Sequence, residues 1–124
     1  MKFKLVQRVN PQDVDAPKKW YANPVNAGTI DQKAIAKEIA GRSSLTAGDV
    51  ANVLENFLDL LPEHLMEGKT VKLGDFGSFR ISFSSEGAAT EKEFSTSTIK
   101  PIRTLFTPSS DFKKALSGIH FQKE

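Results

Sequence analysis

The residue types that most often perform catalysis are sparse in this chain of 124 residues. Cysteine is absent, and His64 and His120 are the only histidines. The absence of cysteine excludes a disulfide framework, a thiolate zinc site and a cysteine nucleophile. Serines are abundant, but neither histidine has evident partners that would complete a nucleophile–base pair. We therefore expect no enzymatic activity, no metal site, no cofactor and no small-molecule substrate.

Two local patterns imitate functional motifs. His64 lies between Glu63 and Glu67, which resembles half of a metal site, but a surface helix histidine is the better interpretation of an isolated residue. The segment Asp75-Phe76-Gly77 matches the metal-binding triplet of protein kinases. The chain is too short for a kinase and has no Gly-rich loop or His-Arg-Asp sequence. We interpret the triplet as a tight turn with a buried phenylalanine.

Basic side chains are the remaining candidates for chemistry, because Lys and Arg neutralise phosphates without strict spacing. The formal net charge is only +2, but it is unevenly distributed. Residues 1–28 hold five basic and two acidic groups, residues 29–68 three and seven, and residues 69–124 nine and six. A polyanion would therefore meet the two flanks. The basic groups after Gly68 indicate either phosphate contacts or an ordinary solvated surface; apart from the terminal Lys123, they are Lys69, Lys72, Arg80, Lys92, Lys100, Arg103, Lys113 and Lys114.

Composition predicts one globular domain with an appendage, since 39% of residues are hydrophobic and 26% are charged. No apolar run approaches the roughly 18 residues of a membrane span. The first residues lack an apolar signal-peptide core, so we expect a cytoplasmic protein without a membrane partner.

Residues 1–28 are predicted to form a hairpin-like extension. Residues 2–9 alternate as a strand, residues 18–22 form a second short strand, and a loop with two prolines separates them. An isolated hairpin is marginal in water. Trp20 and Tyr21, beside two lysines, either dock this extension on the core or form a base-stacking platform, and docking is the favoured interpretation.

Residues 29–68 are predicted to form two helices. Thr29 is the expected start of the first helix, and Thr46 with Asp49 starts the second. A long apolar stripe from Val50 to Leu65 marks the second helix, and Gly68 lies just past its end. Pro62 should kink or split this helix because it removes one backbone donor.

The remaining residues are predicted to form a sheet and a short helix. Residues 70–73 and 78–83 alternate as a hairpin around the turn 74–77, and residues 99–107 resume extended structure. Residues 84–98 are rich in Ser, Thr, Gly, Ala and Glu and are interpreted as an exposed, mobile excursion. A short helix is expected over 111–117, followed by a tail at 119–124.

The order of these elements resembles the HU/IHF family of bacterial nucleoid DNA-binding proteins. The similarity rests on a long second helix, then Gly68-Lys69-Thr70-Val71-Lys72-Leu73 and the turn Gly74-Asp75-Phe76-Gly77-Ser78-Phe79. It covers roughly residues 29–117. Residues 1–28, with Lys-Lys-Trp-Tyr, resemble the N-terminal extension of a divergent HU-related branch.

The resemblance implies an α+β fold with two N-terminal helices, an antiparallel three-stranded sheet with a β-arm and a short C-terminal helix. It also implies an intertwined homodimer, and we expect Phe57, Leu61, Phe76 and Phe79 to form its core. The implied domains are an extension (1–28), an HU-like DNA-binding domain (29–118) and a tail (119–124). The implied partner is double-stranded DNA in the nucleoid, contacted through the eight basic residues named above.

One departure from the family concerns the arm. The family's arm carries a basic tract and a proline that inserts between base pairs. Residues 84–98 contain no proline and hold Lys92 against Glu86, Glu91 and Glu93. We expect backbone binding with little sequence preference. The alternative is an interaction module that has kept the HU scaffold and lost strong DNA binding.

Overall fold

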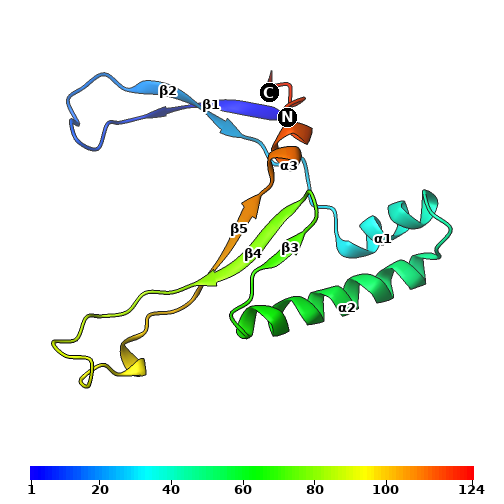
Figure 1. Cartoon of the computed structure of the whole chain (residues 1–124). Helices are drawn as coiled ribbons and strands as arrows, with labels where there is room; N and C mark the ends of the chain where they lie inside the picture. Colours follow the sequence, from blue (N-terminus) through cyan, green and yellow to red (C-terminus); the bar gives the residue numbers. More distant parts are fainter. The chain divides into compact units, whose positions relative to one another are not determined.

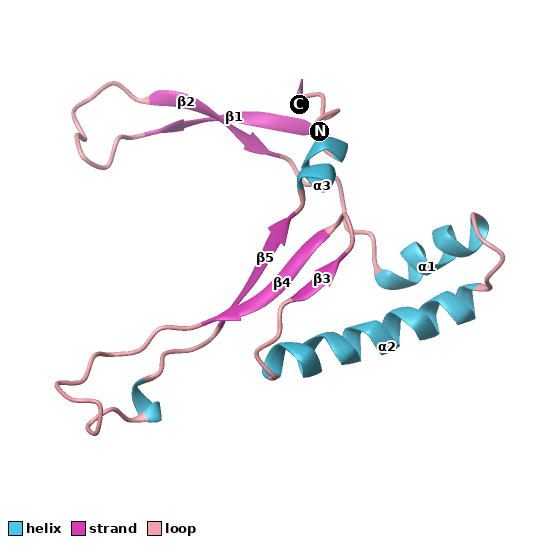
Figure 2. Cartoon of the chain, in the orientation of Figure 1, coloured by secondary structure: helices cyan, strands magenta, loops and turns pink.

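The computed structural model describes all residues, 1–124, and divides them into two compact units. Unit 1 consists of Met1–Asp31 together with Leu116–Glu124, and unit 2 consists of Gln32–Ala115. Unit 1 contains strands and loops, whereas the α-helices and a second sheet belong to unit 2. Figures 1 and 2 show these α-helices and strands along the chain, which is an α+β composition.

Unit 2 begins with the helices α1 (Gln32–Gly41) and α2 (Ala47–Met66), which pack against each other. The predicted cap of α2 is confirmed. The Thr46 hydroxyl accepts a hydrogen bond from the Asp49 amide at 3.1 Å, and the Asp49 carboxylate accepts one from the Thr46 amide at 3.2 Å. This reciprocal pair satisfies two helix donors that would otherwise lack partners.

The predicted end of α2 at Gly68 is also confirmed. Gly68 has a φ of +82°, a conformation that glycine adopts without a side-chain clash. The amides of Gly68 and Lys69 donate to the carbonyls of Leu65 and His64 at 3.0 and 3.2 Å. This Schellman pattern satisfies the last carbonyls of the helix and turns the chain into the sheet.

Two helix predictions are wrong. Helix α1 begins at Gln32, so Thr29 lies three residues before it and is not its cap. Helix α2 continues through Pro62 as one rod (Figure 1). Pro62 withdraws the amide that would bond the carbonyl of Leu58. Leu58 is exposed, so water is available to that carbonyl and the helix need not break.

The sheet of unit 2 contains β3 (Val71–Leu73), β4 (Gly77–Ser82) and β5 (Arg103–Pro108), all antiparallel in the order β3-β4-β5. A tight turn joins β3 to β4, with the Phe76 amide donating to the Leu73 carbonyl at 2.9 Å. The Asp75-Phe76-Gly77 triplet is therefore a turn, as predicted. Phe76 is 41% exposed rather than buried within this chain.

The segment between β4 and β5 is not a regular β-arm. It holds an isolated bridge between Ser85 and Ile99 and a 3₁₀ helix at Thr96–Thr98. Hydrogen bonds from Lys100 to the Ser84 carbonyl and from Glu86 to the Thr98 carbonyl continue the pairing for a short distance. Apart from the 3₁₀ helix, the chain beyond them follows loops, as Figure 2 shows.

A short helix, α3 (Ser110–Ala115), follows β5 and is fixed by Ser109. The Ser109 hydroxyl accepts from the Phe112 amide at 3.0 Å and donates to the Asp75 carbonyl. The Ser109 amide donates to the Phe76 carbonyl at 3.0 Å. One residue thus caps α3 and ties it to the β3–β4 turn.

Unit 1 contains its own three-stranded sheet, in the order β2-β1-β6. The predicted hairpin is formed by β1 (Lys2–Arg8) and β2 (Lys19–Pro24), which pair antiparallel. Residues 119–124, expected to be a tail, instead contain β6 (Gln122–Lys123), which pairs parallel to β1. This pairing of sequence-distant segments adds the third strand that a hairpin needs for independent stability.

Candidate nucleic-acid interface

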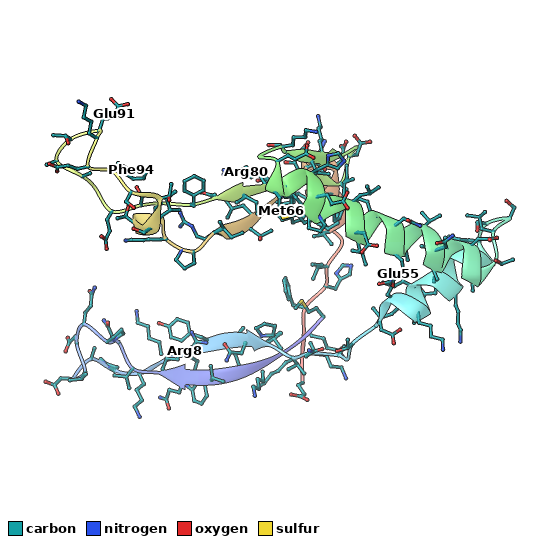
Figure 3. The ribbon with its side chains drawn as sticks, turned by 90° about the horizontal axis from the view of Figure 1, so that it is seen from below. Arg8, Glu55, Met66, Arg80, Glu91 and Phe94 are labelled. Carbon is teal, nitrogen blue, oxygen red and sulfur yellow. The ribbon has the colours of Figure 1, made fainter.

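Three of the expected phosphate-binding residues lie on one face of the unit 2 sheet. Lys72 is opposite Ser78, Arg80 is opposite Leu105, and Ser82 is opposite Arg103. Because paired residues point to the same side and alternate residues share a face, Lys72, Arg80 and Arg103 lie together. All three are exposed. We call them the basic sheet face; Figure 3 labels Arg80 on β4.

The opposite face of this sheet is apolar and faces α2. Phe79 and Ile81 of β4 and Phe106 of β5 lie on it by register, and α2 contacts both β3 and β4. Helix α2 and the three cations of the basic sheet face therefore lie on opposite sides of the sheet. This leaves the basic sheet face open to a partner.

The other five predicted cations lie on segments outside the strands of this sheet. Lys69 lies directly after α2 and forms an ion pair with Glu67 at 2.7 Å. Lys100 precedes β5, Lys113 and Lys114 occupy the last turn of α3, and Lys92 lies in the excursion. All are exposed. The sheet register thus places three of the eight predicted phosphate-binding residues on one face, and the other five residues come from four separate segments.

The excursion between β4 and β5 carries mainly negative charge. Glu86, Glu91 and Glu93 outnumber Lys92 there, and all four are exposed. Figure 3 shows Glu91 at the outer end of this loop. An acidic loop repels phosphates within about 10 Å at 0.1 M ionic strength.

The expected dimer-core residues include two members of a phenylalanine cluster, Phe76, Phe79, Phe106 and Phe112. The ring of Phe106 lies 4.9 Å from the rings of both Phe76 and Phe79, and Phe76 meets Phe112 edge-on at 4.9 Å. Phe57 and Leu61, one turn apart on α2, are half-buried. Of the expected dimer-core residues, Phe76 and Phe79 therefore lie in the same aromatic cluster. Phe57 makes no ring contact with this cluster.

Very little of the chain is buried. Only Ala36, Val50 and Leu65 are buried apolar residues. The accessible surface is 10452 Å². A compact chain of this mass would expose about 6,600 Å², and two separately folded units of these sizes about 7,800 Å². The exposed residues include large apolar side chains such as Val53, Leu58 and Met66, and an exposed apolar surface of this kind favours a partner that covers it.

An apolar groove adds to this exposed surface. It has a volume of about 630 Å³ between the end of α2 and the strands β4 and β5, and Leu65, Met66, Ile81 and Phe83 are among its lining residues. Figure 3 shows Met66 at this end of α2.

Trp20 and Tyr21 cannot form one stacking platform. They are neighbours in β2, so their side chains lie on opposite faces of the unit 1 sheet. Both residues were predicted to lie in one strand, and the alternation of side chains along a strand is enough to place them on opposite faces. The cap of the short helix was expected at Pro108-Ser109-Ser110, but the link from Ser109 to Asp75 was not, because it spans 34 residues.

The described chain holds no cluster of three or more His, Cys, Asp or Glu side chains arranged for a metal ion. None of its helices is long and apolar enough to cross a membrane.

Solved structures share this fold. A point mutant of HU from Thermotoga maritima matches with a TM-score of 0.53 and 18% identity, over 71% of this chain and 100% of its own. Anabaena HU, solved in a cocrystal with DNA, matches with a TM-score of 0.54 and 19% identity, over 73% of this chain and 100% of its own. The fold is therefore that of HU proteins.

A longer structure extends the match to unit 1. A Bacteroides vulgatus protein, solved as a candidate bacterial DNA-binding protein, matches with a TM-score of 0.64 and 18% identity. It covers 98% of this chain, whereas the chain covers 47% of it.

Sequence comparison agrees with this class. Integration host factor subunit alpha of Caulobacter vibrioides is 33% identical over 57 residues, which is 46% of this chain. The chain spans about 57% of that curated relative. The model of the family described as "HU domain fused to wHTH, Ig, or Glycine-rich motif" matches residues 1–123. The chain belongs to this family, a branch of the HU/IHF DNA-binding proteins.

Proposed function

We propose that this protein binds double-stranded DNA through the phosphate backbone, with little sequence preference, as a nucleoid-associated protein without catalytic activity. The observation that carries the proposal is the basic sheet face, where Lys72, Arg80 and Arg103 project together from an HU-like sheet. Lys and Arg on a rigid sheet neutralise phosphates and release counterions, which supplies affinity independent of sequence. The other proposed contacts are Lys69, Lys92, Lys100, Lys113 and Lys114.

We assign this role to an HU-like domain of residues 29–118, acting as a homodimer. Its core would contain Phe57, Leu61, Phe76 and Phe79 from both copies. The large exposed apolar surface supports this, because a two-fold interface would cover it on both copies at once. Residues 1–28 form the extension in this proposal, and residues 119–124 are the C-terminal segment whose strand β6 pairs with it.

Backbone contact, rather than insertion between bases, is the proposed mode. Minor-groove architectural proteins insert apolar wedges between base steps, and the wedge that the resemblance to the HU/IHF family implies is a proline. Residues 84–98 contain none, and their carboxylates disfavour close approach to phosphates. The single large apolar side chain available there is Phe94, which is 43% exposed.

The alternative is a protein-interaction module that has kept the HU scaffold without strong DNA binding. The acidic excursion is the specific observation in its favour. It predicts that affinity for duplex DNA is negligible even at low salt, and that Glu91 and Glu93 contribute to binding a basic partner.

The test is a titration of duplex DNA at several salt concentrations with a variant of the basic sheet face. Replacing Lys72, Arg80 and Arg103 by Gln should flatten the slope of log affinity against log salt by about 0.9 for each phosphate that is no longer neutralised. The matched control replaces Lys33, Lys37 and Arg42, three exposed cations of α1 and its C-terminal end, by Gln. Equal slopes for the two triple variants would reject the basic sheet face as the interface.

A further inference from the structure

The sheet of unit 1 has two chemically different faces. In β1, Phe3 and Leu5 alternate with Lys2, Lys4 and Arg8. Register places Trp20 and Ala22 of β2 on the Phe3 side, and Lys19 and Tyr21 on the Arg8 side. We call Lys2, Lys4, Arg8, Lys19 and Tyr21 the hairpin basic face.

The strands of this sheet carry no acidic side chain, and Glu124 directly follows β6. The strands β1, β2 and β6 contain no Asp or Glu, and Lys2, Lys4 and Lys19 have no carboxylate within ion-pair distance. Along β1, alternate residues are about 6.6 Å apart. The strands therefore present a short row of cations and one aromatic ring, with Glu124 beside Lys4 as the acidic residue at the edge of this face.

Arg8 and Lys19 are directly opposite each other across the hairpin. Like charges at such positions, with Cβ atoms about 5 Å apart, destabilise an antiparallel pair. A functionless hairpin would gain stability from a carboxylate or a neutral residue at either position. An anion bound on this face would offset such repulsion.

Arg8 is held in a defined position on this face. Its guanidinium donates to the side-chain oxygen of Asn23 and lies 5.6 Å from the centre of the Tyr21 ring. A groove of about 570 Å³ adjoins it, lined by Arg8, Lys19, Tyr21 and the β1–β2 loop. A pre-positioned guanidinium beside a groove is suited to phosphate, because its planar donors match two phosphate oxygens.

We propose that the hairpin basic face is a second DNA-binding surface that contacts the phosphates of a duplex, separate from the basic sheet face of unit 2. The proposal rests on the proposed function, because it assumes that the same DNA is bound by both units. The charge complementarity of four cations with a phosphate backbone selects this partner. The distal part of the hairpin is two-stranded, since β6 pairs only with Lys2 and Phe3, and a two-stranded ribbon fits the major groove.

The experiment uses the full chain with duplex DNA over a series of salt concentrations. The test variant is Lys4→Gln/Lys19→Gln, and the comparison within unit 1 is Lys4→Gln against Lys123→Gln. Lys123 pairs with Phe3 in register and so lies on the opposite, apolar face. Each single variant removes one charge from the same sheet, which makes the comparison one of position alone.

The double variant should flatten the slope of log affinity against log salt by about 1.8, because two phosphates are no longer neutralised. Lys4→Gln should account for about half of this change, and Lys123→Gln should leave the slope unchanged. Circular dichroism and thermal melting should show the same fold in all variants, because the substituted side chains are exposed.

Two results would overturn the inference while leaving the proposed function intact. One is wild-type binding with a slope that neither Lys4→Gln nor the double variant alters. The other is binding of the wild type to phosphatidylglycerol vesicles that disappears in the double variant while its DNA slope stays at the wild-type value, which would assign the face to a lipid surface. Absence of wild-type DNA binding at low salt would instead refute the proposed function itself.

Discussion

Gly77 faces Phe106 so closely that there is no room for a side chain at residue 77. A Cβ atom placed there would lie 2.6 Å from a carbon of the Phe106 ring and 2.5 Å from the carbonyl oxygen of Thr107. Gly77 also has a φ of +154°, which L side chains rarely adopt. The phenylalanine cluster therefore requires a glycine at the start of β4.

Gly77→Ala should destabilise the fold by about 2–4 kcal/mol, because it combines overpacking with backbone strain. Urea denaturation at a fixed protomer concentration measures this. Gly41→Ala is the matched control, since Gly41 ends α1 with nothing within 4 Å of an added Cβ and no positive φ. The control should be neutral or slightly stabilising. Equal stability of the two variants would contradict the packing described for β4.

Ser109→Ala should cost about 1–2 kcal/mol and loosen α3. The substitution removes both the cap on Phe112 and the hydrogen bond to the Asp75 carbonyl. Ser110→Ala is the comparison, because the adjacent Ser110 makes no side-chain hydrogen bond in the structure. Hydrogen exchange of the α3 amides should accelerate only in the Ser109 variant. Unchanged protection of the α3 amides in both variants would show that the hydrogen bonds of the Ser109 side chain do not stabilise α3.

The protein should sediment as a dimer of about twice its 13.6 kDa mass, with a melting temperature that rises with protomer concentration. Phe76→Ala should weaken the dimer, because this ring is 41% exposed in one copy and lies in the phenylalanine cluster. Phe94→Ala, in the excursion, removes an equally exposed ring and should leave the mass unchanged. A wild-type monomer with a concentration-independent melting temperature would contradict the dimer.

Removing charge from the excursion should strengthen DNA binding. Glu91→Gln/Glu93→Gln reduces repulsion of phosphates, so affinity should rise at low salt and the gain should vanish near 1 M salt, where screening is nearly complete. Glu38→Gln/Glu63→Gln, on α1 and α2, is the control with the same charge change. A loss of affinity in the excursion variant would mean that these carboxylates make productive contacts.

Local signals in the sequence predicted the parts of the fold that local chemistry determines. The Thr46–Asp49 cap follows from two side chains that are three residues apart. The end of α2 follows from Gly68, since glycine readily adopts the positive φ that this position has. Alternation at 78–83 predicted β4, and Lys-Phe-Lys-Leu predicted β1. These features depend on neighbours along the chain, so a single sequence contains enough information to predict them.

Features that depend on distant partners were not predictable in the same way. Pairing of Gln122 with Lys2 joins the two ends of the chain through a strand of two residues, too short for a pattern. The grouping of Arg80 with Arg103 depends on the β4–β5 register across a long excursion. The course of α2 through Pro62 depends on exposure of the turn before it. Each of these is a tertiary property that overrides local propensity.

The most direct test of the central claim is a titration of duplex DNA by the wild-type protein across about 50–500 mM salt, with its oligomeric state measured in the same samples. Binding by a dimer, with log affinity falling linearly against log salt by about 0.9 for each contacted phosphate, is the predicted result. Absence of measurable binding at about 50 mM salt, or an affinity that salt does not change, would contradict it.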